Sequence, residues 1–199
     1  MSSRDRMLEA AIAVIEEHGE AGVRVDQIAA AGGVAKPSLY HFFGSREGLV
    51  AAAQAERYRR SLLVGIDQAT ARLEQCRSLD EFRELVRAWA GSFASAEARR
   101  RRAFRVDVLG SSVTRPELQA EIAKANVIAT AQLAEFIAVA RARGWALQSI
   151  DLEPEDLAIW LHGLWNGRYL GDIADDPSVV DGWDRVTITL LEFLLLDGA

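Results

Sequence analysis

Histidine and cysteine, the residue types that most often carry catalysis or bind metals, are scarce in this chain. The three histidines are His18, His41 and His162, and none has a carboxylate or a second histidine at the spacing of metal ligands. Cys76 is the only cysteine, so the sequence has no disulfide framework and no cysteine metal cluster. Phosphate loops, dinucleotide-binding fingerprints and nucleophile elbows are also absent from the sequence. These observations predict a protein that is not an enzyme and has no cofactor and no metal site.

Polar side chains suited to binding a nucleic acid gather in one short segment. Leu39 and Phe43 are four residues apart, so in a helix they share one face, which we expect to be buried. Pro37 fits the first turn of such a helix, where its missing N–H leaves no helical hydrogen bond unmade. The start and outer face of the helix then carry the following polar residues: Lys36, Ser38, Tyr40 and His41.

Simpler structural roles are open for several of these residues. We expect Phe42 and Phe43 to be core aromatics, and a place in the core is the alternative for Tyr40. For Lys36, the alternative is a solvated lysine. A binding role therefore depends on the fold that surrounds the segment.

Helical periodicity dominates the whole chain and no alternating strand pattern occurs, so we expect an all-α protein. Glycine and proline mark the ends of about nine helices, three short ones followed by six longer ones. The expected helices cover approximately residues 3–17, 25–31, 36–44, 46–73, 78–93, 99–111, 116–144, 154–174 and 177–196.

The first three helices predict a helix-turn-helix unit. Gly19 ends the first helix, and Gly32 and Gly33 break the chain between the second and the third. In such units the last helix enters the major groove of DNA. The polar face of residues 36–41 is therefore expected to meet double-stranded DNA.

Four stretches of this segment form a recognisable pattern: Met7-Leu8-Glu9-Ala10-Ala11, Glu17-His18-Gly19, Asp26-Gln27-Ile28-Ala29 and residues 33–49. With them, residues 4–50 closely resemble the amino-terminal domain of the tetracycline-repressor (TetR) family of transcriptional regulators. The resemblance combines helix spacing, the turn glycine and the aromatic positions. The rest of the chain resembles the family only in the number and order of its helices.

The resemblance implies a role for each polar residue of the third helix. Lys36 and Ser38 would approach base edges or phosphates, and Tyr40 and His41 would contact the DNA backbone. Arg46 stands where the family usually has a phosphate-binding lysine, and it keeps the charge that a phosphate needs. The predicted DNA-binding residues are Lys36, Pro37, Ser38, Tyr40, His41 and Arg46.

Two positions depart from the family pattern. Arg24 replaces the usual serine or threonine before the second helix, so a hydroxyl contact to phosphate is lost. Asp26 brings a negative charge close to DNA, whose phosphates would repel it. These departures support the alternative that the protein binds a small molecule and no longer binds DNA.

The last two helices indicate contact with a second copy of the chain. The final helix has two apolar stripes, which predicts that it is buried on both sides. Gly163, Gly167 and Gly171 are four residues apart in the preceding helix and form a ridge that lets another backbone come close. We expect a four-helix homodimer interface, as the resemblance also implies, and close packing within one chain is the alternative. The stripe assigned to the interface is Trp183, Val186, Leu190 and Leu194.

The longer helices also carry side chains that fit a small-molecule site. His162, Trp165 and Tyr169 lie opposite the glycine ridge and are expected to point into the body of the protein. Asn126 stands in an apolar stripe, where a buried amide needs a partner. A pocket with aromatic walls and few polar groups is typical of ligand sites, whereas the alternative is an ordinary filled core. The remaining predicted wall residues are Trp89, Phe93 and Phe104.

The charge of the chain does not by itself indicate nucleic-acid binding. The formal net charge is −6, and residues 1–60 are neutral overall. The run Arg99–Arg102 is expected to be a solvated helix start, with contact to DNA or to an acidic loop as the alternative. No apolar run is expected to span a membrane and no signal peptide is recognised, so we expect a cytoplasmic protein.

Two domains are expected: residues 1–50 bind DNA, and residues 51–199 bind a ligand and form the dimer. The expected function is a ligand-responsive transcriptional repressor, released from an inverted-repeat operator by a small apolar or aromatic molecule. The expected partners are a double-stranded DNA operator, this small-molecule effector and a second copy of the chain, with no membrane. A small helical enzyme is disfavoured because no catalytic constellation is present.

Overall fold

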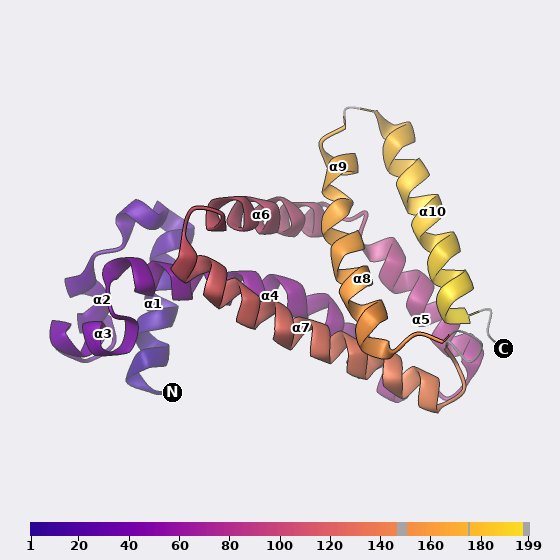
Figure 1. Cartoon of the computed structure of the whole chain (residues 1–199), viewed down its shortest axis with the longest axis horizontal. Coiled ribbons are helices and arrows are strands. Elements are labelled where there is room, and N and C mark those ends of the chain that lie inside the picture. The colour runs from indigo at the N-terminus through magenta and orange to yellow at the C-terminus, as the bar shows by residue number, and fades with distance from the viewer. Residues whose placement is uncertain (147–150, 175, 197–199) are drawn as a thin grey trace. The chain divides into compact units, whose positions relative to one another are not determined.

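The computed structural model describes residues 1–146, 151–174 and 176–196, and every regular element in these ranges is a helix (Figure 1). The predicted all-α fold is confirmed. The side chains of residues 177 and 194–196 lie outside the described part. The elements are α1 (Ser3–His18), the 3₁₀ helix η1 (Glu20–Gly22), α2 (Val25–Ala31), α3 (Lys36–Phe43), α4 (Arg46–Gln75), α5 (Leu79–Ser92), α6 (Ala96–Ser112), α7 (Pro116–Ala142), α8 (Pro154–Gly167), α9 (Tyr169–Asp172) and α10 (Pro177–Leu196).

One predicted helix is divided in the structure. The helix expected over residues 154–174 consists of α8 and the four-residue α9, separated at Arg168. The backbone of Arg168 is still helical, and its N–H donates to the carbonyl of Leu164 at 3.1 Å, so the chain continues in nearly the same course. Gly167, the last residue of α8, stands directly before this interruption, but it was assigned to the glycine ridge and not to a helix end.

By their internal contacts the described residues form two compact units. The first comprises Met1–Arg60 with Val108–Asn126, and the second comprises Ser61–Asp107 with Val127–Ala199. The long helices α4, α6 and α7 each contribute residues to both units. These units do not test the expected functional division at residue 50 between a DNA-binding domain and a ligand-binding domain, which remains a prediction.

Helix α1 begins with a capping box and buries one apolar stripe in the first unit. The Ser2 hydroxyl accepts a hydrogen bond from the backbone N–H of Asp5, and the Asp5 carboxylate accepts one from the N–H of Ser2. Helices α1, α2 and α3 enclose a common core with the start of α4 (Figure 1). The core residues are Met7, Ala11, Ile12, Ile15, Val23, Ile28, Ala29, Leu39, Leu49, Val50 and Ala53.

The turn between α2 and α3 requires both of its glycines. A Cβ atom on Gly32 would lie 2.4 Å from Cγ of Met7, so no larger residue fits against α1 without a shift. Gly33 has a φ of 68°, in the left-handed region that favours glycine. The guanidinium of Arg6 donates to the carbonyl of Gly32 at 2.8 Å, which fixes the turn against α1. The predicted helix-turn-helix break is therefore confirmed at these positions.

The second unit has an aromatic core built from α5, α7 and the residues that follow α7. Ser78 caps α5 by accepting a hydrogen bond from the N–H of Glu81, and Phe82 is fully buried on the inner face of that helix. The ring centroid of Phe82 lies 6.3 Å from that of Phe136 and 5.9 Å from that of Trp145. Helix α10 packs against α5 and α9, which brings the last helix onto the same unit.

Helix α7 has the length and composition of a possible membrane span, contrary to the expectation from the sequence. Its buried residues include Leu133, Phe136 and Ile137, which belong to the core of the second unit. Core helices of globular proteins commonly pass the same test of length and composition. The membrane interpretation is therefore weakly supported.

Candidate functional site

Helix α3 exposes the polar face that was predicted to contact DNA. Leu39 is fully buried in the core of the first unit, which fixes the orientation of the helix. Tyr40 is 47% exposed, so its alternative place in the core is excluded. The other predicted residues of the helix are exposed or half-buried: Lys36, Pro37, Ser38 and His41. This face can offer a cation, hydroxyl groups and an imidazole to phosphates or base edges.

Phe42 does not lie in the core, so that prediction is wrong. Its side chain is 43% exposed, whereas Phe43 is half-buried and packs against the core as expected. At about 100° per residue, the face shared by Leu39 and Phe43 leaves Phe42 at its edge. The Phe42 ring packs edge-on against the rings of His41 and Phe43, at centroid distances of 5.6 Å and 6.4 Å. Phe42 therefore adds an exposed apolar group beside the polar face.

Arg46, predicted to bind a phosphate, also has partners within the chain. Its guanidinium donates to the backbone carbonyls of Val23 at 3.1 Å and Glu20 at 2.5 Å, and it pairs with Glu47 at 2.6 Å. These bonds join the start of α4 to the first residue of η1 and to the residue that follows η1. Arg46 thus supports the fold of the first unit, and phosphate binding by it stays a prediction.

Glu20 is a polar junction of the first unit that sequence analysis missed. Its Oε1 atom accepts hydrogen bonds from Gln54 at 2.7 Å and from Arg115 at 2.9 Å. Burial raises the pKa of Glu20, but the hydrogen bonds from Arg115 and Gln54 outweigh it, so the pKa is lowered overall. Arg115 is 95 residues away along the chain, so no local spacing could have indicated this contact.

The two residues that depart from the family pattern lie at the start of α2. The side chain of Arg24 makes no capping hydrogen bond there. Asp26 is exposed in the first turn, where its charge interacts favourably with the helix dipole. Asp26 therefore has a structural reason to be present, which accounts for an acid at this position.

A cavity in the second unit lies among α4, α5, α6 and α8. Its empty volume is about 490 Å³, part of which is open to solvent. Trp165 contacts both other aromatic walls, with ring centroids 4.9 Å from Trp89 and 5.3 Å from Phe93. Of the predicted ligand-binding residues, the cavity brings together Trp89, Phe93, His162 and Trp165.

Three predicted ligand-binding residues, Phe104, Asn126 and Tyr169, do not line this cavity. Asn126 belongs to the first unit, where its Oδ1 atom accepts a hydrogen bond of 3.0 Å from the hydroxyl of Tyr58. Its position in an apolar stripe predicted a buried amide, and in the structure the amide is partly buried and has a partner. That partner is a tyrosine of the chain itself, so Asn126 is not a wall residue of this cavity.

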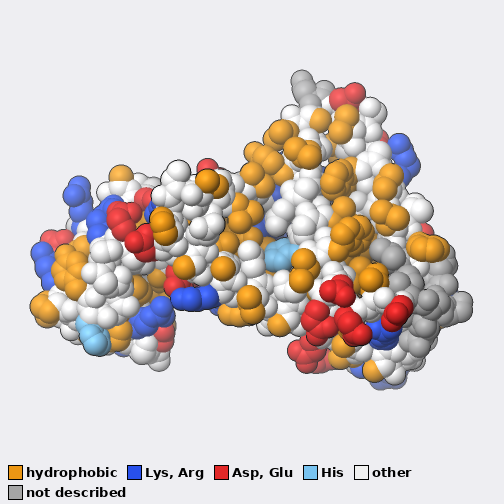
Figure 2. Space-filling view, viewed as in Figure 1, with side chains coloured by type: hydrophobic (Ala, Val, Ile, Leu, Met, Phe, Trp, Pro, Cys, Tyr) orange, Lys and Arg blue, Asp and Glu red, His pale blue; other side chains and the backbone are white. Residues whose placement is uncertain are grey.

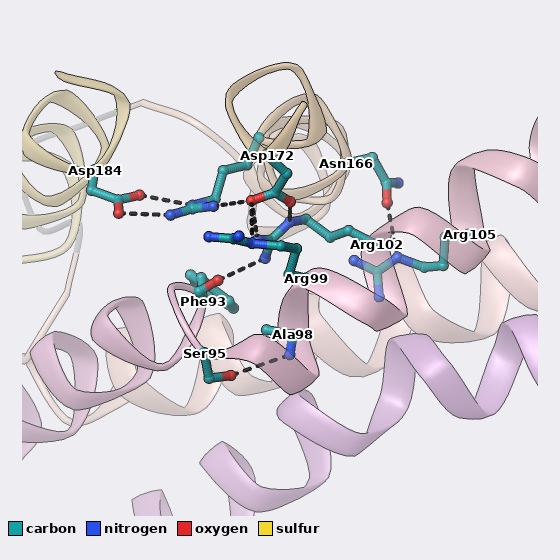
Figure 3. Close-up of polar contacts among 10 residues, drawn as sticks. Phe93, Ser95, Ala98, Arg99, Arg102, Arg105, Asn166, Asp172 and Asp184 are labelled. Atoms are coloured by element: carbon teal, nitrogen blue, oxygen red, sulfur yellow. Dashed lines mark hydrogen bonds and ion pairs between the residues drawn. The ribbon is translucent and has the colours of Figure 1, made fainter. Parts of the chain in front are cut away.

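Sequence analysis missed the polar wall of the cavity, which α6 and α8 provide. Arg105 is buried, and its Nε atom donates to Oδ1 of Asn166 at 2.9 Å (Figure 3). A second nitrogen of Arg105 donates to the carbonyl of Ser61 at 3.2 Å. Arg101 and Arg102 also line the cavity. Helical spacing could have indicated this wall, because Arg102 and Arg105 lie on the same helix face as buried Ala98 and Val108.

Arg102 corrects the expectation that residues 99–102 form a solvated helix start. Its side chain and that of Asp172 are both only 2% exposed. Arg102 donates to the two Asp172 oxygens at 2.5 Å and 2.8 Å and to the carbonyl of Phe93 at 2.8 Å (Figure 3). Burial raises the pKa of Asp172, but its arginine partners lower it further, so the carboxylate stays ionised. Arg168 also binds Asp172, and it donates to both oxygens of Asp184 at 2.8 Å.

His162 is a neutral polar group in the cavity wall. Burial lowers its pKa to about 4, and the positive charge of Arg105 contributes in the same direction. Near pH 7 its imidazole is therefore uncharged. It can offer one donor and one acceptor nitrogen to a ligand.

The glycine ridge of α8 and α9 packs partly within its own chain. A Cβ atom on Gly167 would lie 3.3 Å from the ring of Trp183, and one on Gly171 would lie 3.9 Å from Val180. Gly163 is exposed, with nothing within 4 Å of a Cβ atom among the described residues. Gly167 and Gly171 therefore meet α10 of the same chain, which was the alternative to a contact between copies.

Apolar side chains nevertheless remain uncovered on the last helices. Val186 is 59% exposed and Leu190 is 37% exposed, whereas Trp183 is half-buried against Gly167. The side chain of Leu194 lies outside the described residues. Figure 2 shows apolar side chains gathered over α8, α9 and α10. Other large apolar residues exposed on these helices or directly after α9 are Ile159, Trp160, Leu170, Ile173, Val179 and Phe193.

Comparison with known proteins identifies the amino-terminal segment. Residues 7–53 match the family model described as bacterial regulatory proteins of the TetR family. The match covers α1, η1, α2, α3 and the first residues of α4, and it confirms the resemblance found in the sequence. No curated protein sequence matches the chain.

Solved structures share the fold over nearly the whole chain. A protein from Rhodococcus sp. described as a TetR-family transcriptional regulator has 21% sequence identity and a TM-score of 0.61, with 97% of this chain and 98% of that chain covered. A TetR-family transcriptional regulator from Pectobacterium atrosepticum has 21% identity and a TM-score of 0.60, with coverages of 98% and 94%. A transcriptional regulator from Saccharomonospora viridis, solved in complex with choline, has 19% identity and a TM-score of 0.56, with coverages of 98% and 97%.

Proposed function

We propose that the chain is a TetR-family transcriptional regulator, as the match of residues 7–53 to the family model supports, and that it binds double-stranded DNA through α3. In this proposal residues 1–50 form the DNA-binding domain, and residues 51–199 bind an effector and form the dimer. The protein acts as a repressor in the cytoplasm and has no enzymatic activity.

One observation carries the DNA-binding part of the proposal. Helix α3 buries Leu39 and exposes Lys36, Tyr40 and His41, so its polar face is free to enter a groove. The lysine and the Tyr40 hydroxyl are suited to phosphate and base-edge contacts. The arrangement requires no net positive charge on the whole chain.

The proposed regulator is a homodimer that binds an inverted repeat. The exposed apolar side chains of Val186, Leu190 and Phe193 on α10 support association with a second copy, because contiguous apolar surface is rarely left open to water. A two-fold dimer presents two copies of α3 to two half-sites related by the same symmetry.

The proposed effector is a small molecule that binds in the cavity of the second unit and releases DNA. Three aromatic rings and a few polar groups line that cavity, which is the usual composition of ligand sites. The Saccharomonospora viridis protein of the same fold holds choline, which supports a small-molecule site in this architecture. An effector shifts DNA affinity only by binding one conformation of the protein more tightly than the other.

A gel-shift titration at fixed salt, with DNA flanking the protein's own coding region, tests the proposal. Lys36→Ala is expected to weaken binding and change sequence preference, and Tyr40→Phe is expected to weaken binding to all sequences alike. These two exposed residues make clean tests, whereas Arg46→Ala would also remove hydrogen bonds to Val23 and Glu20. Exposed Arg100, which pairs with Glu97 on α6, provides the control variant Arg100→Ala.

Unchanged affinity in both α3 variants would reject α3 as the DNA-contacting surface. If the wild-type protein binds no DNA but binds small molecules, the alternative function of a small-molecule binding protein would replace the regulator.

A further inference from the structure

Two hydrogen-bond donors in the cavity of the second unit have no acceptor. The Nε1 atoms of Trp89 and Trp165 are buried, and neither has a hydrogen-bond partner among the described residues. Buried polar groups in native proteins are nearly always paired, so two orphans on adjacent rings need an explanation. Both residues line the same cavity, and their ring centroids are 4.9 Å apart.

The position of one of these donors at the cavity wall is given by Gly65. This glycine of α4 lines the cavity, and a Cβ atom added to it would lie 3.3 Å from Nε1 of Trp89. A side chain at residue 65 would therefore press on the indole ring of Trp89, so the glycine lets that ring lie at the cavity wall.

The charged residues of the cavity wall all have the same sign. Arg101, Arg102 and Arg105 line the cavity, and no acidic residue is among its described lining residues. The acidic partners of Arg101 and Arg102 are exposed Glu97 and buried Asp172, and neither acid is among the lining residues. The lowered pKa of His162, caused by burial and then by the charge of Arg105, agrees with a positive potential inside the cavity.

We propose that this cavity binds a small organic carboxylate with an apolar body about the size of one aromatic ring. The carboxylate accepts hydrogen bonds from the indole N–H groups of Trp89 and Trp165 in the field of Arg105, and charge-assisted bonds of this kind are among the strongest in proteins. The body packs against the apolar wall residues Leu62, Ile66 and Phe93. This inference rests on the proposed function, in which the same cavity is the effector site.

Other ligand chemistries fit the wall less well. Aromatic rings alone can hold an organic cation, but here the charge of Arg105, which also lowers the pKa of His162, would repel it. A neutral ligand can satisfy the indole donors, but it gains nothing from the positive potential. The order of affinity for molecules of equal shape is therefore anion, then neutral molecule, then cation.

A matched set of three probes tests this order on the full-length wild-type protein. The probes 3-phenylpropanoate, 3-phenylpropan-1-ol and 3-phenylpropylamine share one ring and one chain length and differ in charge at pH 7.5. Calorimetry is expected to give the anion an affinity roughly tenfold or more above that of the alcohol, with the amine weakest. Nuclear magnetic resonance should show the indole N–H signals of Trp89 and Trp165 shifting with the anion, while that of exposed Trp160 stays in place.

Equal or tighter binding of the alcohol or the amine would overturn the proposal, as would binding of none of the three. Trp89→Phe and Trp165→Phe keep an aromatic ring and remove the donor, so each is expected to reduce anion affinity several-fold and alcohol affinity by a smaller factor, because the bond to a charged acceptor is the stronger one. Trp160→Phe is the matched control because Trp160 does not line the cavity. If a tryptophan variant fails to fold, the comparison of the three probes on the wild-type protein still tests the proposal.

Failure of this inference can be distinguished from failure of the proposed function. If 3-phenylpropanoate binds the cavity and DNA remains bound, the carboxylate site stands and the effector role is lost. If a neutral compound binds the cavity and releases DNA while the anion does not bind, the effector role stands and the carboxylate assignment is rejected.

Discussion

Arg102 and Asp172 form an ion pair with both side chains only 2% exposed, and two guanidinium nitrogens face the two carboxylate oxygens. Arg168 is a second partner of the same carboxylate and also holds Asp184. One buried acid thus connects α6 to α9 and, through Arg168, to α10. The network lies directly behind the cavity wall, to which Arg102 itself belongs.

Replacing Asp172 by asparagine is expected to destabilise the protein strongly. The change leaves the buried charge of Arg102 without its counter-ion, and breaking a buried pair in this way typically costs about 3–5 kcal/mol. Urea unfolding at pH 7 measures the loss. Glu97→Gln is the control, because Glu97 forms exposed pairs and should change stability far less than Asp172→Asn does. A loss for Asp172→Asn as small as the control's would show that the network contributes little.

His162 is expected to make stability fall as the pH is lowered through the weakly acidic range. Its pKa is about 4 in the folded protein and about 6.5 in the unfolded chain. Between these values the unfolded state binds a proton that the folded state does not, so acid favours unfolding. The loss is complete only below pH 4 and amounts to about 3 kcal/mol in full.

The His162 contribution can be separated from other titrating groups by comparison with His162→Asn. Both proteins keep Arg101, Arg102, Arg105 and Asp172, so the effects of these groups cancel in the difference. The stability difference between wild type and variant is expected to be constant above pH 7 and to shift against the wild type as the pH falls to 4. If the plots of stability against pH for the two proteins stay parallel over this range, the lowered pKa of His162 is contradicted.

Asn126 and Tyr58 are expected to act as a pair in stability. Tyr58→Phe and Asn126→Leu each remove one partner of the 3.0 Å hydrogen bond and should each cost about 1–3 kcal/mol. The double variant should cost less than the sum, because the second change then removes no further bond. Thermal unfolding of the four proteins measures the coupling. A strong loss of effector affinity in Asn126→Leu, with unchanged stability, would return Asn126 to the ligand site.

Gly167 and Gly163 are expected to respond differently to the same substitution. Gly167→Leu would press its side chain into Trp183 of the same chain and should destabilise the fold by about 1–3 kcal/mol through overpacking. Gly163→Leu meets open space and gains helix propensity, so the fold should tolerate it.

Sedimentation equilibrium together with unfolding separates the fold from association in these two variants. If α8 takes part in a homodimer, Gly163→Leu should alter the dimer dissociation constant without loss of monomer stability. Destabilisation by Gly163→Leu equal to that by Gly167→Leu would contradict the intrachain packing of Gly167. A wild-type protein that is monomeric at micromolar concentration would reject the dimer itself.

The sequence by itself determined the local elements and the candidate DNA-binding face. Helix ends follow from capping and turn residues next to them in the chain, so Pro37, Gly33 and Gly44 were sufficient to define α3 and its flanks. The burial of Leu39 beside exposed Tyr40 follows from helical periodicity, which is also a local property. Four aromatic and histidine residues of the cavity were found in the same way, because they project from inward helix faces.

Only the tertiary structure decided which distant residues are partners. The partners Arg102 and Asp172 are 70 residues apart along the chain, and Tyr58 and Asn126 are 68 residues apart. Glu20 and Arg115 are 95 residues apart. From the sequence alone a charged side chain such as Arg102 is expected to be solvated, because burying a charge without a counter-charge is costly. The counter-charge of Arg102 is Asp172, which lies on another helix. Gly167 was predicted to belong to a ridge at an interface between copies, because Trp183, against which it packs, lies on another helix. Side-chain partners are set by the packing of helices, and that packing is not encoded within any one of them.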